Sequence, residues 1–146
     1  MKINSPLTSK NEVLPLVEAG ADSFYAGVNF SKLFGNRILS SRWHCSNAEF
    51  QSEEEILEAT KLVKDNNKEI YLTVNEHNYK PEHMELVADF VVKHSKKFTG
   101  FIVSSLPLIL KIDKRAELVA STGLRITNHK AVKFYKDLGL KKIILP

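Results

Sequence analysis

Short apolar runs alternate with longer amphipathic stretches along this chain, and that alternation limits its fold more than any other feature. The runs at 70–74, 101–103 and 143–145 are continuously apolar, as strands of a parallel sheet are when both faces are covered. Strands that alternate with helices favour parallel β–α–β units. We predict strands at residues 2–6, 23–27, 69–75, 100–105, 116–122 and 141–146.

The stretches between these runs carry the signals of helices. Over 52–67, Ser52 can cap the first turn, glutamates follow it, and Asn66 and Asn67 can adopt the left-handed turn that ends a helix. Further helices are predicted at 9–20, 81–97 and 128–139, the last one capped by Thr127, and 106–113 fits either a short helix or an irregular segment.

Two α/β architectures accommodate strands and helices in this order. One is an incomplete (β/α) TIM-like barrel of about six parallel strands, and the other is an open doubly wound parallel sheet. A complete barrel needs about 250 residues, whereas this chain has 146. No Gly-x-Gly-x-x-Gly follows the first predicted strand, and no P-loop occurs. We expect one barrel-like domain over residues 1–146, the N-terminal part of a longer architecture.

Composition excludes several classes of protein. A single cysteine, Cys45, cannot form an internal disulfide framework. No apolar run approaches the roughly 20 residues that span a bilayer, and the N-terminus lacks the apolar region of a signal peptide. We therefore expect a cytoplasmic protein with no membrane partner.

The formal net charge is +4, and the positive charge is concentrated between Lys111 and Lys142. Such a segment can attract an anionic partner such as RNA. The alternative is a set of solvated helix faces, which needs no partner.

Four stretches of the chain form an ordered set of motifs: "EAGADSFYAGVN", "IYLTVNEHN", "GFIVSS" and "LVASTGLRITNHKAVKFYKDLGLKKIILP". In this order, and over nearly the whole chain, they resemble the collagenase-like peptidases of peptidase family U32. The matching positions are Gly20, Ala21, Asp22, Tyr25, Gly27, Thr73, Asn75, Ser121, Thr122, Thr127 and Asn128. The chain departs from the family pattern at "SPLT" and "GLRITN", and it ends before the family's cysteine region.

The resemblance implies a (β/α) barrel domain and a hydrolase that acts on peptides. Some members of the family instead support hydroxylation of RNA bases or of quinone precursors, with an iron–sulfur cluster on four downstream cysteines. A component of such a system is therefore an alternative, and a non-catalytic assembly subunit is another. We expect no cofactor in this segment, because a cluster would require that downstream region.

Polar residues follow the predicted strands, whose carboxyl ends form the working rim of a (β/α) barrel. After the third strand, Glu76 is a candidate general acid or base, with His77 as its partner or as a proton carrier. Adjacent strand residues point to opposite faces, so a polar loop remains the alternative.

The same rim supplies candidates for substrate binding. Arg42, in the long segment 28–50, can bind a carboxylate or a phosphate bidentately. Phe24 and Tyr25 should point to opposite faces of the strand, one toward the helices and one into the barrel interior, with Tyr25 the residue whose hydroxyl can reach toward the rim. The predicted substrate-binding residues are Tyr25, Asn29, Arg42, Asn75, Ser121 and Asn128. No Cys-x-x-Cys or His-Glu-x-x-His pattern occurs, so no metal site is predicted.

An incomplete barrel exposes the edges of its first and last strands. We expect a second copy of the chain, or additional C-terminal chain, to cover these edges. The isolated chain is therefore expected to dimerise or aggregate, which sedimentation analysis would reveal.

Overall fold

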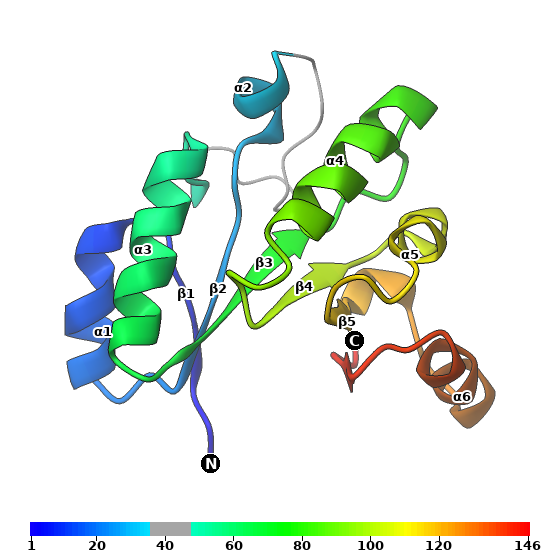
Figure 1. The fold of residues 1–146 in the computed structure, drawn as a ribbon. Coiled ribbons are helices and arrows are strands. Elements are labelled where there is room, and N and C mark those ends of the chain that lie inside the picture. The colour runs from blue at the N-terminus through cyan, green and yellow to red at the C-terminus, as the bar shows by residue number, and fades with distance from the viewer. Residues whose placement is uncertain (36–47) are drawn as a thin grey trace.

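The computed structural model describes residues 1–35 and 48–146, and its strands form one parallel sheet in chain order (Figure 1). They are β1 (Asn4–Pro6), β2 (Ser23–Ala26), β3 (Glu69–Val74), β4 (Gly100–Val103), β5 (Leu118–Ala120) and β6 (Lys142–Ile143). Each strand pairs in parallel with the next one along the chain. A doubly wound sheet reverses its strand order part-way. The incomplete barrel is therefore confirmed, and the doubly wound alternative is wrong.

Helices join the strands and flank the curled sheet (Figure 1). They are η1 (Lys10–Glu12), α1 (Val13–Glu18), α2 (Phe30–Phe34), α3 (Glu53–Asp65), α4 (Pro81–Lys93), α5 (Leu106–Ile112), η3 (Thr122–Leu124) and α6 (His129–Asp137). Among these described helices, none combines the length and the apolar character needed to cross a membrane.

The predicted helix caps are confirmed in α3 and corrected in α6. Ser52 caps α3, and its hydroxyl accepts a hydrogen bond from the Glu55 backbone N–H at 3.2 Å. The cap of α6 is Asn128 rather than Thr127, because the backbone of Asn128 is extended and its Oδ1 accepts from the Ala131 N–H at 3.0 Å.

The two faces of the sheet bury different side chains. Phe24 and Phe101 lie between the sheet and the helices and are fully buried there. Tyr71 and Val119 pack together on the opposite, concave face, with Tyr25 against them. The prediction that Phe24 and Tyr25 point to opposite faces is confirmed, because neighbouring residues of a strand alternate between its faces.

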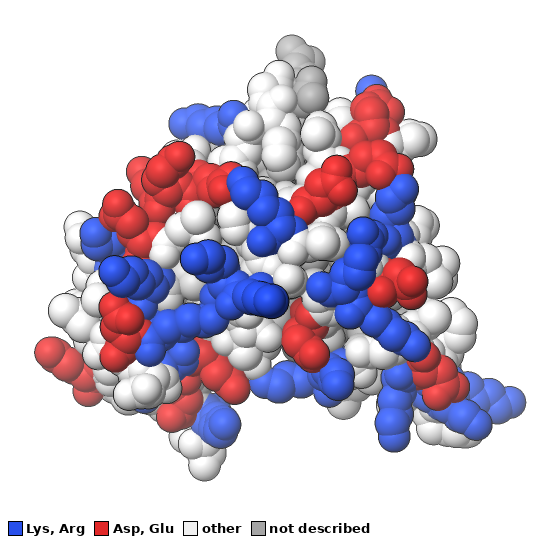
Figure 2. Space-filling view, viewed as in Figure 1, with Lys and Arg blue, Asp and Glu red and all other residues white. Residues whose placement is uncertain are grey.

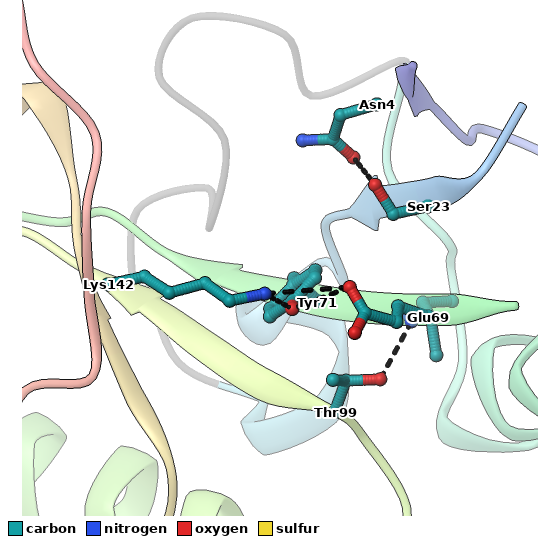
Figure 3. Close-up of polar contacts among 7 residues, drawn as sticks. Asn4, Ser23, Glu69, Tyr71, Thr99 and Lys142 are labelled. Carbon is teal, nitrogen blue, oxygen red and sulfur yellow. Dashed lines mark hydrogen bonds and ion pairs between the residues drawn. The ribbon is translucent and has the colours of Figure 1, made fainter. Parts of the chain in front are cut away.

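Three polar residues form a cluster on the concave face, at the end where the strands begin (Figure 3). Tyr71 donates a hydrogen bond to Glu69 Oε2 at 3.0 Å, and Lys142 contacts the Tyr71 hydroxyl. The Lys142 ammonium also lies 4.7 Å from the centre of the Tyr71 ring. A Cβ on Gly100 would lie 3.4 Å from that ring, so glycine leaves room for it over β4.

This interior cluster connects β6 to β3 across the two strands between them. Its hydrogen bond with Tyr71 raises the pKa of Lys142, so the ammonium stays charged. Burial raises the pKa of Tyr71, so its hydroxyl stays protonated. The cluster therefore fixes the short strand β6 in place and stabilises the curvature of the sheet. It lies at the end where the strands begin, which in (β/α) barrels serves stability.

Lys142→Met should lower the free energy of unfolding by about 1 kcal/mol, because it keeps the side-chain stem but removes the ammonium. The substitution should also accelerate backbone hydrogen exchange in β6 more than it does in β1. Lys10→Met is the matched control, because Lys10 makes an exposed ion pair with Glu58 at 2.8 Å, and exposed pairs contribute little to stability. Equal effects of the two substitutions on β6 exchange would contradict a special role for Lys142.

A buried histidine connects the end of α4 to the start of α3. His94 Nε2 lies 3.1 Å from Glu53 Oε1, and the Phe90 ring packs on the imidazole with a centroid separation of 4.5 Å. Burial lowers the pKa of His94, and the Glu53 carboxylate offsets this only in part. A hydrogen bond from Lys93 lowers the pKa of Glu53.

Stability should therefore fall as the pH drops from about 7 to 5. Below an unfolded pKa of about 6.5, the unfolded chain binds a proton at His94 more readily than the folded chain does. His94→Gln should flatten this part of the curve of unfolding free energy against pH. An unaltered slope in His94→Gln would contradict this assignment. The lowered pKa of Glu53 adds a second loss at more acidic pH.

Candidate functional site

The carboxyl ends of β3, β4 and β5 are neighbours, and the polar residues that follow them form one rim. Thr73, near the end of β3, donates from its hydroxyl to the Ala26 carbonyl of β2 at 3.0 Å. This buried bond fixes the end of β3 against its neighbour. The loop after β3 therefore starts from a rigid position, as a binding site requires.

His77 is held against the loops of the two following strands. A Cβ built on Gly123 would lie 2.6 Å from His77 Cε1 and 2.9 Å from Ser104 Cβ. The imidazole therefore occupies space that any other residue at position 123 would fill. Ser104 donates to the Glu76 carbonyl at 3.5 Å, which ties the β4 end to the same loop.

Glu76 shapes the loop that carries His77. Its Oε1 accepts hydrogen bonds from the backbone N–H groups of His77 at 2.8 Å and Asn78 at 3.0 Å. The predicted pair is thus adjacent in space, but these bonds join the carboxylate to the backbone. An acid–base role for Glu76 and His77 stays a prediction.

Two buried polar atoms in this loop have no hydrogen-bond partner among the described residues: Asn75 Oδ1 and the Tyr79 hydroxyl. Burial raises the pKa of Tyr79, and the charge of Glu76 adds to this effect, so the hydroxyl remains a donor. Buried polar groups without partners are costly and rare. Asn75 Oδ1 is therefore available to accept a hydrogen bond from a ligand N–H or O–H.

The other predicted substrate-binding residues have mainly local roles in the structure. Ser121 Oγ accepts from the Gly123 N–H at 3.3 Å and caps η3 within the rim. Asn29 caps α2 by accepting from the Lys32 N–H at 3.1 Å, and Asn128 caps α6. Tyr25 lies below the rim on the concave face. Arg42 lies outside the described residues.

The structure therefore brings together Asn75, Glu76, His77 and Ser121, and the hydrogen bonds of Asn29 and Asn128 are made with their own helices. The sequence reasoning did not select Gly123. Its only signal was a glycine directly after a predicted strand, within the "STG" stretch.

A separate cavity of about 560 Å³ lies between η1, α2 and α3. Its lining includes Thr8, Lys10, Lys32, Glu49, Glu55 and Glu58. None of the described residues predicted for the site lines this cavity. Within residues 1–35 and 48–146, no three His, Cys, Asp or Glu side chains are grouped so that they could hold a metal ion.

Comparisons with known proteins identify a family and two curated relatives. The model of peptidase family U32 matches residues 8–146. The tRNA hydroxylation protein P1 of Bacillus subtilis is 30% identical over 135 residues, which cover 88% of this chain and 29% of that protein. An uncharacterized protease of Methanocaldococcus jannaschii is 28% identical over 148 aligned positions, which cover 99% of this chain and 33% of the relative.

A solved structure of a U32 peptidase shares the fold. The TM-score is 0.67 at 14% sequence identity, with 99% of this chain and 58% of the other chain covered. Identity at this level supports the fold alone. The chain spans about a third of the length of the two curated relatives.

Proposed function

The chain belongs to peptidase family U32, and we propose that it forms the substrate-binding wall of a hydrolase that takes a peptide across the rim of the half-barrel. The placement of His77 carries this proposal, because its imidazole lies against Gly123, and Ser104 of the neighbouring strand end borders the same space. An imidazole can accept and return a proton near neutral pH. Asn75 Oδ1, buried and without a partner among the described residues, suits a peptide N–H.

Hydrolysis of fluorescein-labelled gelatin by the intact chain tests this function. His77→Ala should lower the rate by about 100-fold or more, the usual effect of losing a proton-transfer group. His83→Ala is the matched control, because His83 lies on α4 and takes no part in the rim contacts. Two results would contradict the proposal: no hydrolysis by the unaltered chain, or an unchanged rate in His77→Ala.

A second candidate function is a part in RNA hydroxylation. The observation that favours it is the 30% identity to a protein named for tRNA hydroxylation. An iron–sulfur cluster needs about four thiolate ligands, and this chain has one cysteine. The chain alone does not fit such a cluster, so its own part would be to bind the RNA. Binding of transfer RNA by the intact chain tests this candidate.

A further inference from the structure

Four lysines surround a groove on the outer, helical side of the molecule. The groove has a volume of about 490 Å³ and lies between α3 and the turn that follows α4. Its lysines are Lys61 and Lys64 on α3, and Lys96 and Lys97 after α4. We call the surface formed by these four lysines and Thr60 the lysine groove.

The charge of the lysine groove is largely uncompensated. None of its four lysines makes an ion pair with another described residue, and Lys64 Nζ donates instead to the Lys96 carbonyl at 3.3 Å. Glu58, which also lines the groove, is already paired with Lys10 at 2.8 Å. Asp65 is the remaining acid in the lining. An anionic partner would therefore meet a net positive surface.

Thr60 places a buried hydroxyl without a hydrogen-bond partner in the wall of the lysine groove, which the electrostatics of the helix ends does not explain. Lysines near the ends of α3 and α4 also suit the negative ends of the helix dipoles. Thr60, however, is only 2% exposed, lines the groove, and its hydroxyl has no hydrogen-bond partner in the described part of the chain. A buried hydroxyl without a partner is costly, and an anionic oxygen held by the lysines would accept its hydrogen bond.

The space-filling view shows how charge is distributed over this face. Basic side chains gather across its middle, below acidic side chains over the starts of α3 and α4 (Figure 2). Helices of this fold run opposite to the strands, so the ends of α3 and α4 lie at the opposite end of the sheet from His77. The lysine groove is therefore separate from the rim site.

We propose that the lysine groove binds the phosphate backbone of RNA, an inference that rests on the second candidate function. Lysines act as point charges toward phosphate oxygens and carry no base specificity. Spread over α3 and the turn after α4, they suit successive phosphates of a strand. RNA bound here would be anchored away from the rim, so the groove positions the RNA and takes no part in chemistry.

Binding of unfractionated bacterial transfer RNA, measured by fluorescence anisotropy from 50 to 200 mM salt, tests the proposal. The double variant Lys96→Gln/Lys97→Gln should bind about tenfold more weakly, with a log–log salt slope reduced by about two. The control is Lys130→Gln/Lys133→Gln, which removes the same charge from exposed positions on α6 and should change binding little. Thr60→Val should weaken binding without lowering the free energy of unfolding.

The possible results distinguish the proposal for the lysine groove from the second candidate function. Equal losses in the two double variants would overturn the groove, because binding would then follow net charge alone. Unchanged binding in the groove variants, with tight binding by the unaltered chain, would overturn the groove and leave the second candidate function standing. No binding of transfer RNA by the unaltered chain would overturn both. Preference for phosphatidylserine vesicles over transfer RNA would assign the groove to a membrane surface and overturn the RNA proposal.

Discussion

Phe24→Ala is expected to lower the free energy of unfolding by about 3–5 kcal/mol, the usual cost of deleting a large buried aromatic side chain. The Phe24 side chain lies in the layer between the sheet and the helices, where it is 0% exposed to solvent. Total stability of a domain is about 5–15 kcal/mol, so this one substitution should remove a large part of it. Urea denaturation followed by circular dichroism measures the change.

Tyr25→Ala is the control at the adjacent position. Tyr25 is half-buried on the concave face, where fewer apolar side chains surround it. Its removal should cost clearly less than that of Phe24, because the cost of truncation grows with the packing that is lost. Equal costs would mean that the concave face is as well packed as the helical face, contrary to this structure.

Gly123→Ala is expected to displace the His77 imidazole and to abolish the proposed hydrolysis. The added Cβ would lie 2.6 Å from His77 Cε1, a separation that real Cβ atoms essentially never show. The backbone of Gly123 is not in the left-handed region, so the effect comes from the contact and not from local strain. Overpacking of this kind costs about 1–3 kcal/mol of stability. The His77 ring signals in NMR spectra report the displacement directly.

The double variant Gly123→Ala/His77→Ala separates the two effects. Removing the imidazole relieves its contact with the new methyl group, so part of the lost stability should return, although the contact with Ser104 remains. Unshifted His77 signals in Gly123→Ala would show that the two residues do not meet at the rim.

In the basic segment from Lys111 to Lys142, several charged side chains make contacts within the fold, and its attraction of an anionic partner stays a prediction. Lys111 pairs with Glu85, and Arg115, in the turn after α5, donates to the Ile112 carbonyl at the end of that helix. Lys142 contacts Tyr71 inside the half-barrel. Several of these charges thus stabilise the fold, and the lysine groove draws its residues from two other segments.

The sequence also could not show which polar residues at the rim cap a helix. Asn75 and His77 were predicted to lie at the rim because they stand at the end of a recognisable strand and parallel strands end at one rim, and the structure places both after β3. The roles of Asn29 and Asn128 as helix caps were missed, because a polar residue after a strand can serve either a ligand or the next helix. In the structure each side chain accepts a hydrogen bond from its own helix, from Lys32 and from Ala131, and substrate binding by either residue stays a prediction.

The amino-acid sequence by itself determined the parallel β–α–β pattern, the positions of most strands and the opposite orientations of Phe24 and Tyr25. These properties follow from local periodicity and from helix-end chemistry, which involve residues close together in the chain. Only the tertiary structure decided that the strands keep their chain order, that His77 meets Gly123, and that Lys64 lies beside Lys96. Those contacts join residues far apart in the chain, and the pairing and curvature of the whole sheet determine them.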